Sequence, residues 1–401
     1  MALLPVEDAL ARLLADAAPL PPETVKLLAA HGRILAVPLA AKFTQPPFDA
    51  SAMDGYAVRA TDVAALPTRL KITGEAAAGR GYTGTVSPGE AVRIFTGAPV
   101  PSGADSIVIQ ENCHRDGDFV VVREGTPEGG NLRPRGGDFL AGADLLKPGI
   151  RLGARQITLA AAMGHSALQV YRKPVVAILA SGDELVLPGT TPATDQIVCS
   201  NPYGVAAMVA AAGGEPRFLG IAGDTRASLN AHIEQATGCD LLITIGGASV
   251  GDHDLIGPVL EARGLKLDFW KIAMRPGKPM LFGRLDGMRV LGLPGNPVSS
   301  LICARVFMMP LIERLTGLNA GPTRFTPAVA AVDLEANGPR THYMRATLER
   351  DVHGRLAARP VRSQDSSLLS PLAAADCLLV RPVGAKAARA GEPVGVLPLD
   401  F

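Results

Sequence analysis

The stretch LLITIGGASVGDHD, at residues 241–254, constrains the fold of this chain most strongly. Its first five residues are apolar or β-branched, a short continuous run typical of a buried strand in a parallel sheet. Gly246 and Gly247 end this run, and the apolar spacing of residues 255–260 predicts an amphipathic helix. A strand, a glycine-rich turn and a helix start make a place for an anion, because free backbone N–H groups point out of such a turn.

This turn matches neither of the common nucleotide-binding motifs. It lacks the G-x-G-x-x-G spacing, and Asp252 and His253 follow Gly251 where a P-loop has Lys and Ser or Thr. Carboxylates would repel a bound phosphate unless a hard cation such as Mg²⁺ lay between them. The alternative is that Asp252 and Asp254 only cap and charge the helix start, and the turn by itself leaves both interpretations open.

Length and composition bound the class of protein. The 401 residues suffice for two to four domains at roughly 100–200 residues per domain, and 47% apolar with 19% charged residues indicates a globular chain. A net charge of +1 and 4% aromatic residues argue against a nucleic-acid surface. No apolar run reaches the ~18 residues of a membrane span. The N-terminus carries early acids and no basic region, so no signal peptide is expected.

The five cysteines are odd in number and widely spaced, with no C-x-x-C pair. This spacing disfavours both a zinc site and a disulfide framework. We therefore expect buried thiols in a protein of the reducing cytoplasm.

The first 172 residues predict two domains, one inserted into the other. Helical periodicity over 5–17 and over 154–163 brackets short β-like runs at 56–58, 70–72, 91–95, 106–109 and 119–122. We expect a β-rich insertion domain at 42–130 within a discontinuous, elongated linker domain of 1–41 and 131–172. Asp54 in SAMDGYA and Thr96 in FTGAP occupy loops of the insertion, where ordinary turn chemistry is the favoured explanation.

From residue 173 to 320 the pattern becomes α/β. Strands are expected at 175–180, 218–221, 241–245 and 267–272, and a hairpin at 280–293 is turned at Asp286-Gly287. Asn201 as N-cap with Pro202 at the first helical position predicts one helix, and PGNP at 294–297 precedes another over 298–315. Alternating strands and helices indicate a mostly parallel sheet.

In such sheets, ligands bind outside the carboxyl ends of the strands. The loops at 181–184, 224, 246–254, 275–278 and 294–297 all leave strand ends, so we expect them to converge on one cleft. Their charged residues fit a metal-bound phosphorylated ligand or an oxyanion: Glu184, Asp224, Asp252, Asp254, Lys271, Arg275 and Lys278. Residues 321–401 predict a C-terminal small β barrel or sandwich. Its candidates are Arg345 and Ser366, for which a surface charge and a turn serine are the favoured explanation from pattern alone.

Six ordered motifs carry a resemblance that covers essentially the whole chain. SAMDGYA, IFTGAPVP, SGDEL, GGASVGDHD, RPGKP and LPGNPVSS resemble those of the molybdopterin molybdenumtransferase family, to which the C-terminal domain of gephyrin also belongs. The resemblance implies an elongated homodimer of four-domain subunits. In it, the α/β domain of one subunit faces the β insertion of the other across the active site.

The implied reaction hydrolyses adenylylated molybdopterin with a divalent cation, releases AMP and inserts molybdenum from molybdate into the dithiolene. The resemblance assigns the following residues. Metal ligands are Glu184, Asp224, Asp252 and Asp254, and the catalytic set is Glu184, Asp224 and Asp254 with Asp54 and Thr96 from the partner subunit. Substrate and phosphate contacts are Ser181, Gly182, Asn201, Gly246, Gly247, Ser249, Gly251, Pro294, Gly295 and Asn296. Molybdate donors are Lys271, Arg275, Lys278, Arg345 and Ser366.

Two residues depart from the family pattern. Arg275 stands where the family commonly has Lys, and Ser367 where many members have Gly. The resemblance also implies contact with the enzyme that adenylylates molybdopterin. The rival interpretations are a non-catalytic molybdopterin-binding or scaffold protein, which the intact acids disfavour, and an unrelated dinucleotide enzyme, which the glycine spacing disfavours.

Overall fold

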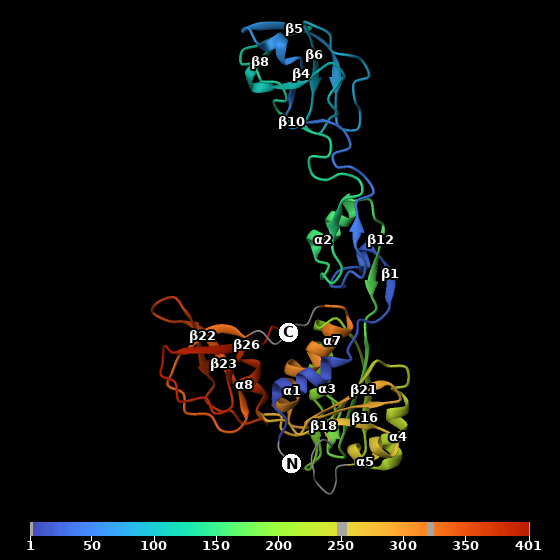
Figure 1. Cartoon of the computed structure of the whole chain (residues 1–401), viewed down its shortest axis with the longest axis vertical. Coiled ribbons are helices and arrows are strands. Elements are labelled where there is room, and N and C mark those ends of the chain that lie inside the picture. The colour runs from blue at the N-terminus through green and yellow to red at the C-terminus, as the bar shows by residue number, and fades with distance from the viewer. Residues whose placement is uncertain (1–2, 247–254, 319–324, 401) are drawn as a thin grey trace. The chain divides into compact units, whose positions relative to one another are not determined.

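A computed structural model describes residues 3–246, 255–318 and 325–400, which form two compact units (Figure 1). The first unit takes its residues from 1–23, 32–36 and 169–401, and the second from 24–31 and 37–168. The chain passes between them four times: within β1 (Pro22–Lys26), at residues 31–32 and 36–37, and within β12 (Ala167–Tyr171). Each unit has its own apolar clusters.

The first unit is built on a six-stranded sheet. Its order is β16 (Glu215–Ala222), β13 (Val175–Ser181), β17 (Leu241–Ile245), β21 (Met288–Leu293), β20 (Leu281–Leu285) and β18 (Lys266–Trp270). The first four strands are parallel, whereas β20 runs antiparallel to both β21 and β18. All five residues of β17 are buried, as the continuous apolar run predicted. The mostly parallel sheet is thus confirmed.

The predicted hairpin turn at Asp286-Gly287 is also confirmed. Both residues have positive φ, +49° and +86°, and they join β20 to β21. A two-residue turn of this handedness matches the twist of the strands that it joins.

Helices cover both faces of this sheet. Successive strand residues alternate between two apolar clusters: Ile178 and Ile243 belong to one, Leu179 and Leu242 to the other. The first cluster includes residues of α3 (Asn201–Ala211). It also includes residues of one long helical segment that consists of α6 (Pro297–Cys303), a π-helical stretch (Ala304–Met308) and α7 (Met309–Leu315). The second includes α4 (Arg226–Glu234) and α5 (Ile256–Ala262). Two layers of helix therefore enclose the sheet.

The N-terminal helix α1 (Val6–Ala15) forms as predicted, and its buried face packs in the first unit. Val6, Ala9, Leu10 and Leu13 lie in the same apolar cluster as α3 and α7, so this helix packs against the helices that cover the α/β sheet. Amphipathic periodicity shows that a helix buries one face, but it does not identify the partner of that face.

The C-terminal residues form a small barrel in the same unit. Its order is β19 (Met274–Arg275), β23 (Thr341–Arg350), β24 (Leu356–Pro360), β22 (Thr326–Ala330), β26 (Pro393–Pro398) and β25 (Cys377–Arg381), closed by pairing of β23 with β25. The predicted barrel is confirmed, and a short helix, α8 (Leu369–Ala373), was not predicted. Tyr343, Leu378 and Leu397 join the core cluster of the α/β helices, so barrel and sheet share one core.

The second unit contains the predicted β-rich insertion. Its sheet has the order β7 (Ser106–Ile109), β4 (Gly55–Val58), β6 (Glu90–Ile94), β5 (Thr68–Ala76), β9 (Phe119–Val122) and β8 (Cys113–Asp116). Within this six-stranded sheet, the sequence analysis missed one strand, the largely exposed β8. The unit also holds α2 (Ala154–Ala162) and two short strand pairs, β2 (Leu39–Ala40) with β11 (Asp144–Leu146) and β3 (Ala50–Ser51) with β10 (Leu132–Arg133).

Two expectations from composition concern the whole chain. All five cysteines are free, and four of them are buried. Among the described residues, no helix is long and apolar enough to cross a membrane.

The place of α1 in the shared core yields a stability prediction. Leu13 is 1% exposed, so Leu13→Ala should lower the free energy of unfolding of the first unit by about 2–5 kcal/mol. Leu187→Ala is the matched control, because Leu187 lies in the same unit but is 48% exposed and should lose far less. Chemical denaturation of both variants measures the difference. Equal losses would contradict the packing of α1 into this core.

Candidate active site

A cavity of about 700 Å³ opens at the carboxyl edge of the sheet in the first unit. Its walls come from the ends of β13, β17 and β21, from the segment that leads into α3, and from the barrel residue Ser367. Nine residues predicted from the sequence line it together: Ser181, Gly182, Glu184, Asn201, Asp224, Gly246, Pro294, Gly295 and Asn296. The predicted convergence of these loops is therefore observed.

Glu184 is held over the turn that follows β13. Gly182 has φ +148°, and a Cβ there would collide with the Glu184 carboxylate, so that carboxylate lies against the Cα of Gly182. Cys199 lines the same cavity, and burial, followed by the nearby charge of Glu184, raises the pKa of its thiol. The glycine thus makes room for an exposed carboxylate at the wall of the cavity.

Asp224 is tied to the same turn by a reciprocal pair of hydrogen bonds. Its backbone N–H donates to Oδ1 of Asp183 at 2.9 Å, and the backbone N–H of Asp183 donates to Oδ2 of Asp224 at 3.4 Å. These bonds fix the turn after β16 against the turn after β13. The sequence analysis did not single out Asp183, although it stands between two assigned residues in the SGDEL motif.

Two glycine turns approach each other where β17 and β21 end. A Cβ on Gly295 would lie 3.5 Å from the Cα of Gly246, and Gly246 itself has φ +92°. Asn201 joins this arrangement by donating from Nδ2 to the Gly295 carbonyl at 2.7 Å. The prediction that Asn201 caps α3 is wrong, because Ser200 occupies the N-cap position and the Asn201 side chain instead bonds across the cavity edge.

Five predicted residues fall outside the described part of the chain: Gly247, Ser249, Gly251, Asp252 and Asp254. Of the proposed metal ligands, Glu184 and Asp224 are described. Within residues 3–246, 255–318 and 325–400, no group of three or more His, Cys, Asp and Glu side chains could hold a metal ion. Neither Glu184 nor Asp224 forms a salt bridge with a described Lys or Arg.

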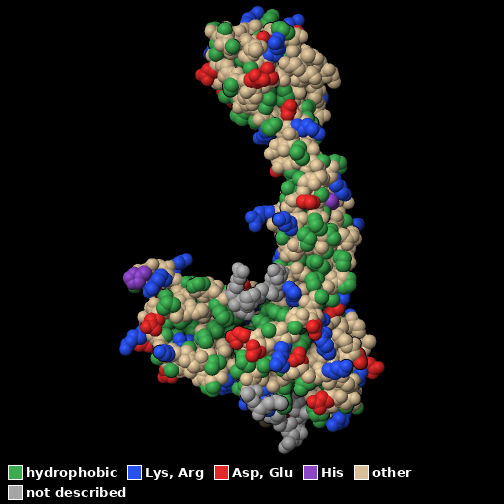
Figure 2. Space-filling view, in the orientation of Figure 1, with side chains coloured by type: hydrophobic (Ala, Val, Ile, Leu, Met, Phe, Trp, Pro, Cys, Tyr) green, Lys and Arg blue, Asp and Glu red, His purple; other side chains and the backbone are tan. Residues whose placement is uncertain are grey.

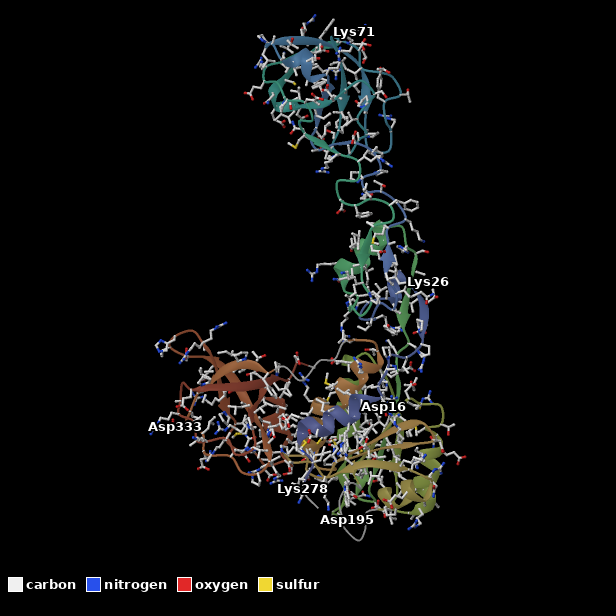
Figure 3. The ribbon with its side chains drawn as sticks, in the orientation of Figure 1. Asp16, Lys26, Lys71, Asp195, Lys278 and Asp333 are labelled. Atoms are coloured by element: carbon white, nitrogen blue, oxygen red, sulfur yellow. The ribbon has the colours of Figure 1, made fainter. Side chains whose placement is uncertain are left out.

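The structure does not place the three basic residues of the RPGKP region on the cavity wall. Arg275 and Lys278 are exposed, and Lys278 is labelled in Figure 3, whereas Lys271 packs its ammonium 4.2 Å from the centre of the Trp270 ring. Pro279, in the same loop, does line the cavity. This loop therefore reaches the cavity only at Pro279, and its predicted basic side chains do not line the cavity wall.

Arg345 has a structural role that the sequence did not reveal. It is 1% exposed, and its two Nη atoms donate to the carbonyls of Ser363, Asp365 and Leu368 at 2.8–2.9 Å. The explanation favoured from pattern alone, that Arg345 is a charged residue on the surface, is therefore wrong. These bonds use three of the five guanidinium N–H groups, so Nε and one N–H of Nη1 have no described partner and remain for a ligand.

The loop that Arg345 holds carries Ser366 and Ser367. The Ser366 carbonyl accepts a hydrogen bond from the N–H of Val298 at 3.1 Å, at the start of α6. Ser367, not Ser366, lines the cavity, and its hydroxyl donates to Asp365 at 2.8 Å. The barrel thus reaches the cavity through a loop that sequence pattern described only as a turn.

Asp54 and Thr96 come together in the second unit. The Asp54 carboxylate accepts two hydrogen bonds from Thr96, one from the backbone N–H and one from the hydroxyl, both at 2.8 Å. These bonds, with the backbone one contributing most, lower the pKa of Asp54. Arg93 packs beside both loops, over the rings of Tyr56 and Phe95. The sequence placed the two residues in separate turns, and the fold makes them one polar cluster.

Charge on the visible face of the first unit is mixed. Figure 2 shows Lys and Arg side chains interspersed with Asp and Glu side chains over this face. This distribution differs from the single basic face expected of a nucleic-acid-binding surface.

The fold and the cavity define a multidomain ligand-binding protein whose parallel sheet presents glycine turns and carboxylates at one edge. Three family descriptions match the chain: "MoeA N-terminal region (domain I and II)" at residues 4–164, "Probable molybdopterin binding domain" at 177–314 and "MoeA C-terminal region (domain IV)" at 327–399. The cavity loops described above, other than that of Ser367, lie within the second of these matches.

Full-length relatives agree with these matches. The chain is 38% identical to a molybdopterin molybdenumtransferase of Nostoc, over 94% of this chain and 89% of that one. It is 33% identical to that of Haemophilus influenzae over 99% of each chain. A crystal structure of a molybdopterin biosynthesis MoeA protein from Pyrococcus horikoshii superposes with a TM-score of 0.85 at 32% identity, covering 100% of both chains. The chain therefore belongs to the MoeA family, the molybdopterin molybdenumtransferases.

The Asp54–Thr96 pair generates a prediction about acidity. Thr96→Val removes the hydroxyl donor but keeps the backbone N–H, so the pKa of Asp54 should rise while staying below its ordinary value of 3.8. Because a lowered pKa stabilises the fold above the unfolded pKa, the variant should lose stability at neutral pH and lose less as the pH falls through the folded pKa. An NMR titration of the Asp54 carboxyl measures the shift. Thr96→Ser is the control, and identical titrations of Thr96→Val and wild type would contradict the hydroxyl bond.

Proposed function

We propose that this chain carries out the reaction of its family, the transfer of molybdenum into molybdopterin. Water attacks the phosphoanhydride of adenylylated molybdopterin, AMP leaves, and molybdate supplies the metal that the dithiolene takes up. The observation that carries the proposal is the convergence of Glu184, Asp224 and two glycine turns on one cavity inside the region matched to molybdopterin-binding domains. An acidic, glycine-lined cavity suits a diphosphate that is bound together with a cation.

The turns at Gly246 and Gly295 would bind the phosphate oxygens. Neither residue presents a side chain, so a diphosphate can approach the backbone of both turns closely. The Gly246 N–H itself donates to the Leu293 carbonyl at 3.2 Å, so we assign the phosphate contacts of that turn to the residues that follow Gly246. The bond from Asn201 to the Gly295 carbonyl would fix the orientation of the second turn. We assign Ser181, Gly182, Pro294 and Asn296 to the same contact surface, because they line the cavity. Asn296 makes no side-chain bond to the start of α6, which leaves its amide available to a ligand.

The carboxylates fit a hard divalent cation such as Mg²⁺. Glu184 and Asp224 supply oxygen ligands of the kind that Mg²⁺ prefers, and neither is neutralised by a described basic residue. We assign Asp252 and Asp254 to the same cation, together with phosphate contacts from Gly247, Ser249 and Gly251. When bound, the cation would offset the charge of the diphosphate and polarise its phosphoryl oxygens. The hydrogen bonds between Asp183 and Asp224 would keep the two carboxylate turns together.

Molybdate capture is assigned to basic residues near the barrel loop. Lys271, Arg275 and Lys278 precede Pro279 on the cavity wall, and Arg345 would offer Nε and one N–H of Nη1, the guanidinium donors that the loop carbonyls leave open. Ser366 makes its described hydrogen bond through its carbonyl, so its hydroxyl is assigned to the dianion. A guanidinium in this position recognises an oxyanion through directed N–H donors.

The working unit of the proposal is a homodimer with composite sites. Asp54 and Thr96 lie in the second unit, together as one polar cluster, and we assign them to the active site of the partner subunit. Their hydrogen bonds hold the Asp54 carboxylate in the charged form that would face a cationic or polarised ligand. We place the reaction in the cytoplasm and expect contact with the enzyme that adenylylates molybdopterin.

The test measures AMP release from adenylylated molybdopterin with Mg²⁺ and molybdate. Glu184→Gln keeps the volume of the side chain and removes its charge, so AMP release should fall roughly 100-fold or more. Asp195→Asn is the matched control, because Asp195 is an exposed acid of the same unit that does not line the cavity. Unchanged release from Glu184→Gln at limiting Mg²⁺ would refute the assignment.

A mixture of two variants tests the composite site in the same assay. Asp54→Ala should also lose activity, but an Asp54→Ala subunit paired with a Glu184→Gln subunit would form one site with both groups intact. The mixed dimer should therefore recover up to about half of the wild-type activity per dimer, since it has one complete site of two. No recovery from a verified heterodimer would show that each site is built from a single chain.

A further inference from the structure

The barrel reaches the cavity through a loop whose first hydrogen bonds continue a β-ladder. Strands β23 and β24 pair as far as Ala346 and Pro360. Beyond them the N–H of Val361 still donates to the carbonyl of Arg345 at 2.9 Å, and the chain then leaves the sheet. The backbone N–H of Arg345 therefore faces a position where the neighbouring strand has ended.

The side chain of Gln364 supplies the missing partner. Its Oε1 accepts from the N–H of Arg345 at 3.0 Å, and its Nε2 donates to the carbonyls of Arg345 at 3.0 Å and Val361 at 3.2 Å. A primary amide has one acceptor oxygen and two N–H donors, and here the oxygen and both N–H groups form hydrogen bonds. The side chain thus acts in place of a strand residue and fixes the start of the loop.

The rest of the loop is held at two further points. The Arg345 guanidinium bonds to the carbonyls of Ser363, Asp365 and Leu368, and the Ser366 carbonyl accepts from Val298 at the start of α6. Ser367 then lines the cavity. A chain of hydrogen bonds therefore runs from the barrel strand β23 through residues 361–368 to the helix beside the glycine turn at Gly295.

We propose that Gln364 is a positioning residue for oxyanion capture: it sets where the loop at 361–368 meets the cavity, and so where Arg345 and Ser366 present their donors. The proposal rests on the proposed function. Like Arg345 and Ser366, Gln364 does not line the cavity, so its effect is exerted through the loop, which reaches the cavity wall at Ser367. Gln364 bonds to the backbone of Arg345, the residue whose side chain holds the loop. It does so through both Oε1 and Nε2 of its amide.

The experiment titrates molybdate in the cofactor-forming reaction of the full-length protein. Gln364→Met keeps the length of the side chain but loses the amide bonds. Gln364→Glu keeps the shape but replaces the donor with an oxygen that faces two carbonyl oxygens. In both variants the molybdate concentration for half-maximal rate should rise about tenfold, because donors held by several hydrogen bonds lose their alignment. The rate at saturating molybdate and the affinity for adenylylated molybdopterin should stay within about twofold of wild type.

The control is Gln235→Met, because Gln235 bonds only to its own helix, at the Ala231 carbonyl, and is exposed. A residue with a merely structural role would lower the unfolding temperature and leave the molybdate titration unchanged. Wild-type titrations of both Gln364 variants would therefore overturn the proposal. An equal loss of affinity for adenylylated molybdopterin and for molybdate in these variants would also overturn the proposal. A wild-type protein that releases no AMP would instead refute the proposed function, and this inference with it.

Discussion

The close approach of two glycine turns at neighbouring strand ends is the constraint on which the site depends. Parallel strands must all end at one edge, and β17 and β21 are adjacent in the sheet. A side chain on Gly295 would extend against the Gly246 backbone, because its Cβ would already lie 3.5 Å from the Gly246 Cα, and a Cβ on Gly246 would lie 3.0 Å from the Ser181 carbonyl oxygen. The small residues free the space between the turns for a ligand. The carboxylate turns at Glu184 and Asp224 and the amide of Asn201 surround that space.

The shared core extends this constraint to the barrel. Because Tyr343, Leu378 and Leu397 pack into the same cluster as the α/β helices, the barrel cannot shift without disturbing the helices that support the glycine turns. The loop held by Arg345 and Gln364 is therefore presented to the cavity from a fixed base. This arrangement explains how a domain far along the chain can supply donors to a site built mainly by the sheet.

Much of this architecture could be predicted from local pattern. The buried run at 241–245, the Asp-Gly hairpin and the convergence of loops at one sheet edge all follow from periodicity and turn chemistry.

Relations between distant segments could not be predicted in that way. The partner of α1, the bond from Asn201 to Gly295 and the burial of Arg345 depend on tertiary packing. Motif resemblance predicted a shared role for Asp54 and Thr96, whereas pattern alone favoured two ordinary turns; the fold joins them by hydrogen bonds. Arg275 and Lys278 are exposed and do not line the cavity, so belonging to the RPGKP motif does not by itself place a side chain on the cavity wall.

The most direct test of the account is a crystal structure of the protein with adenylylated molybdopterin and Mg²⁺. The account predicts density for the diphosphate within hydrogen-bond distance of the turns that begin at Gly246 and Gly295, and close to the carboxylates of Glu184 and Asp224. Density for the ligand at another place, with this cavity holding only water, would contradict the assignment of the site.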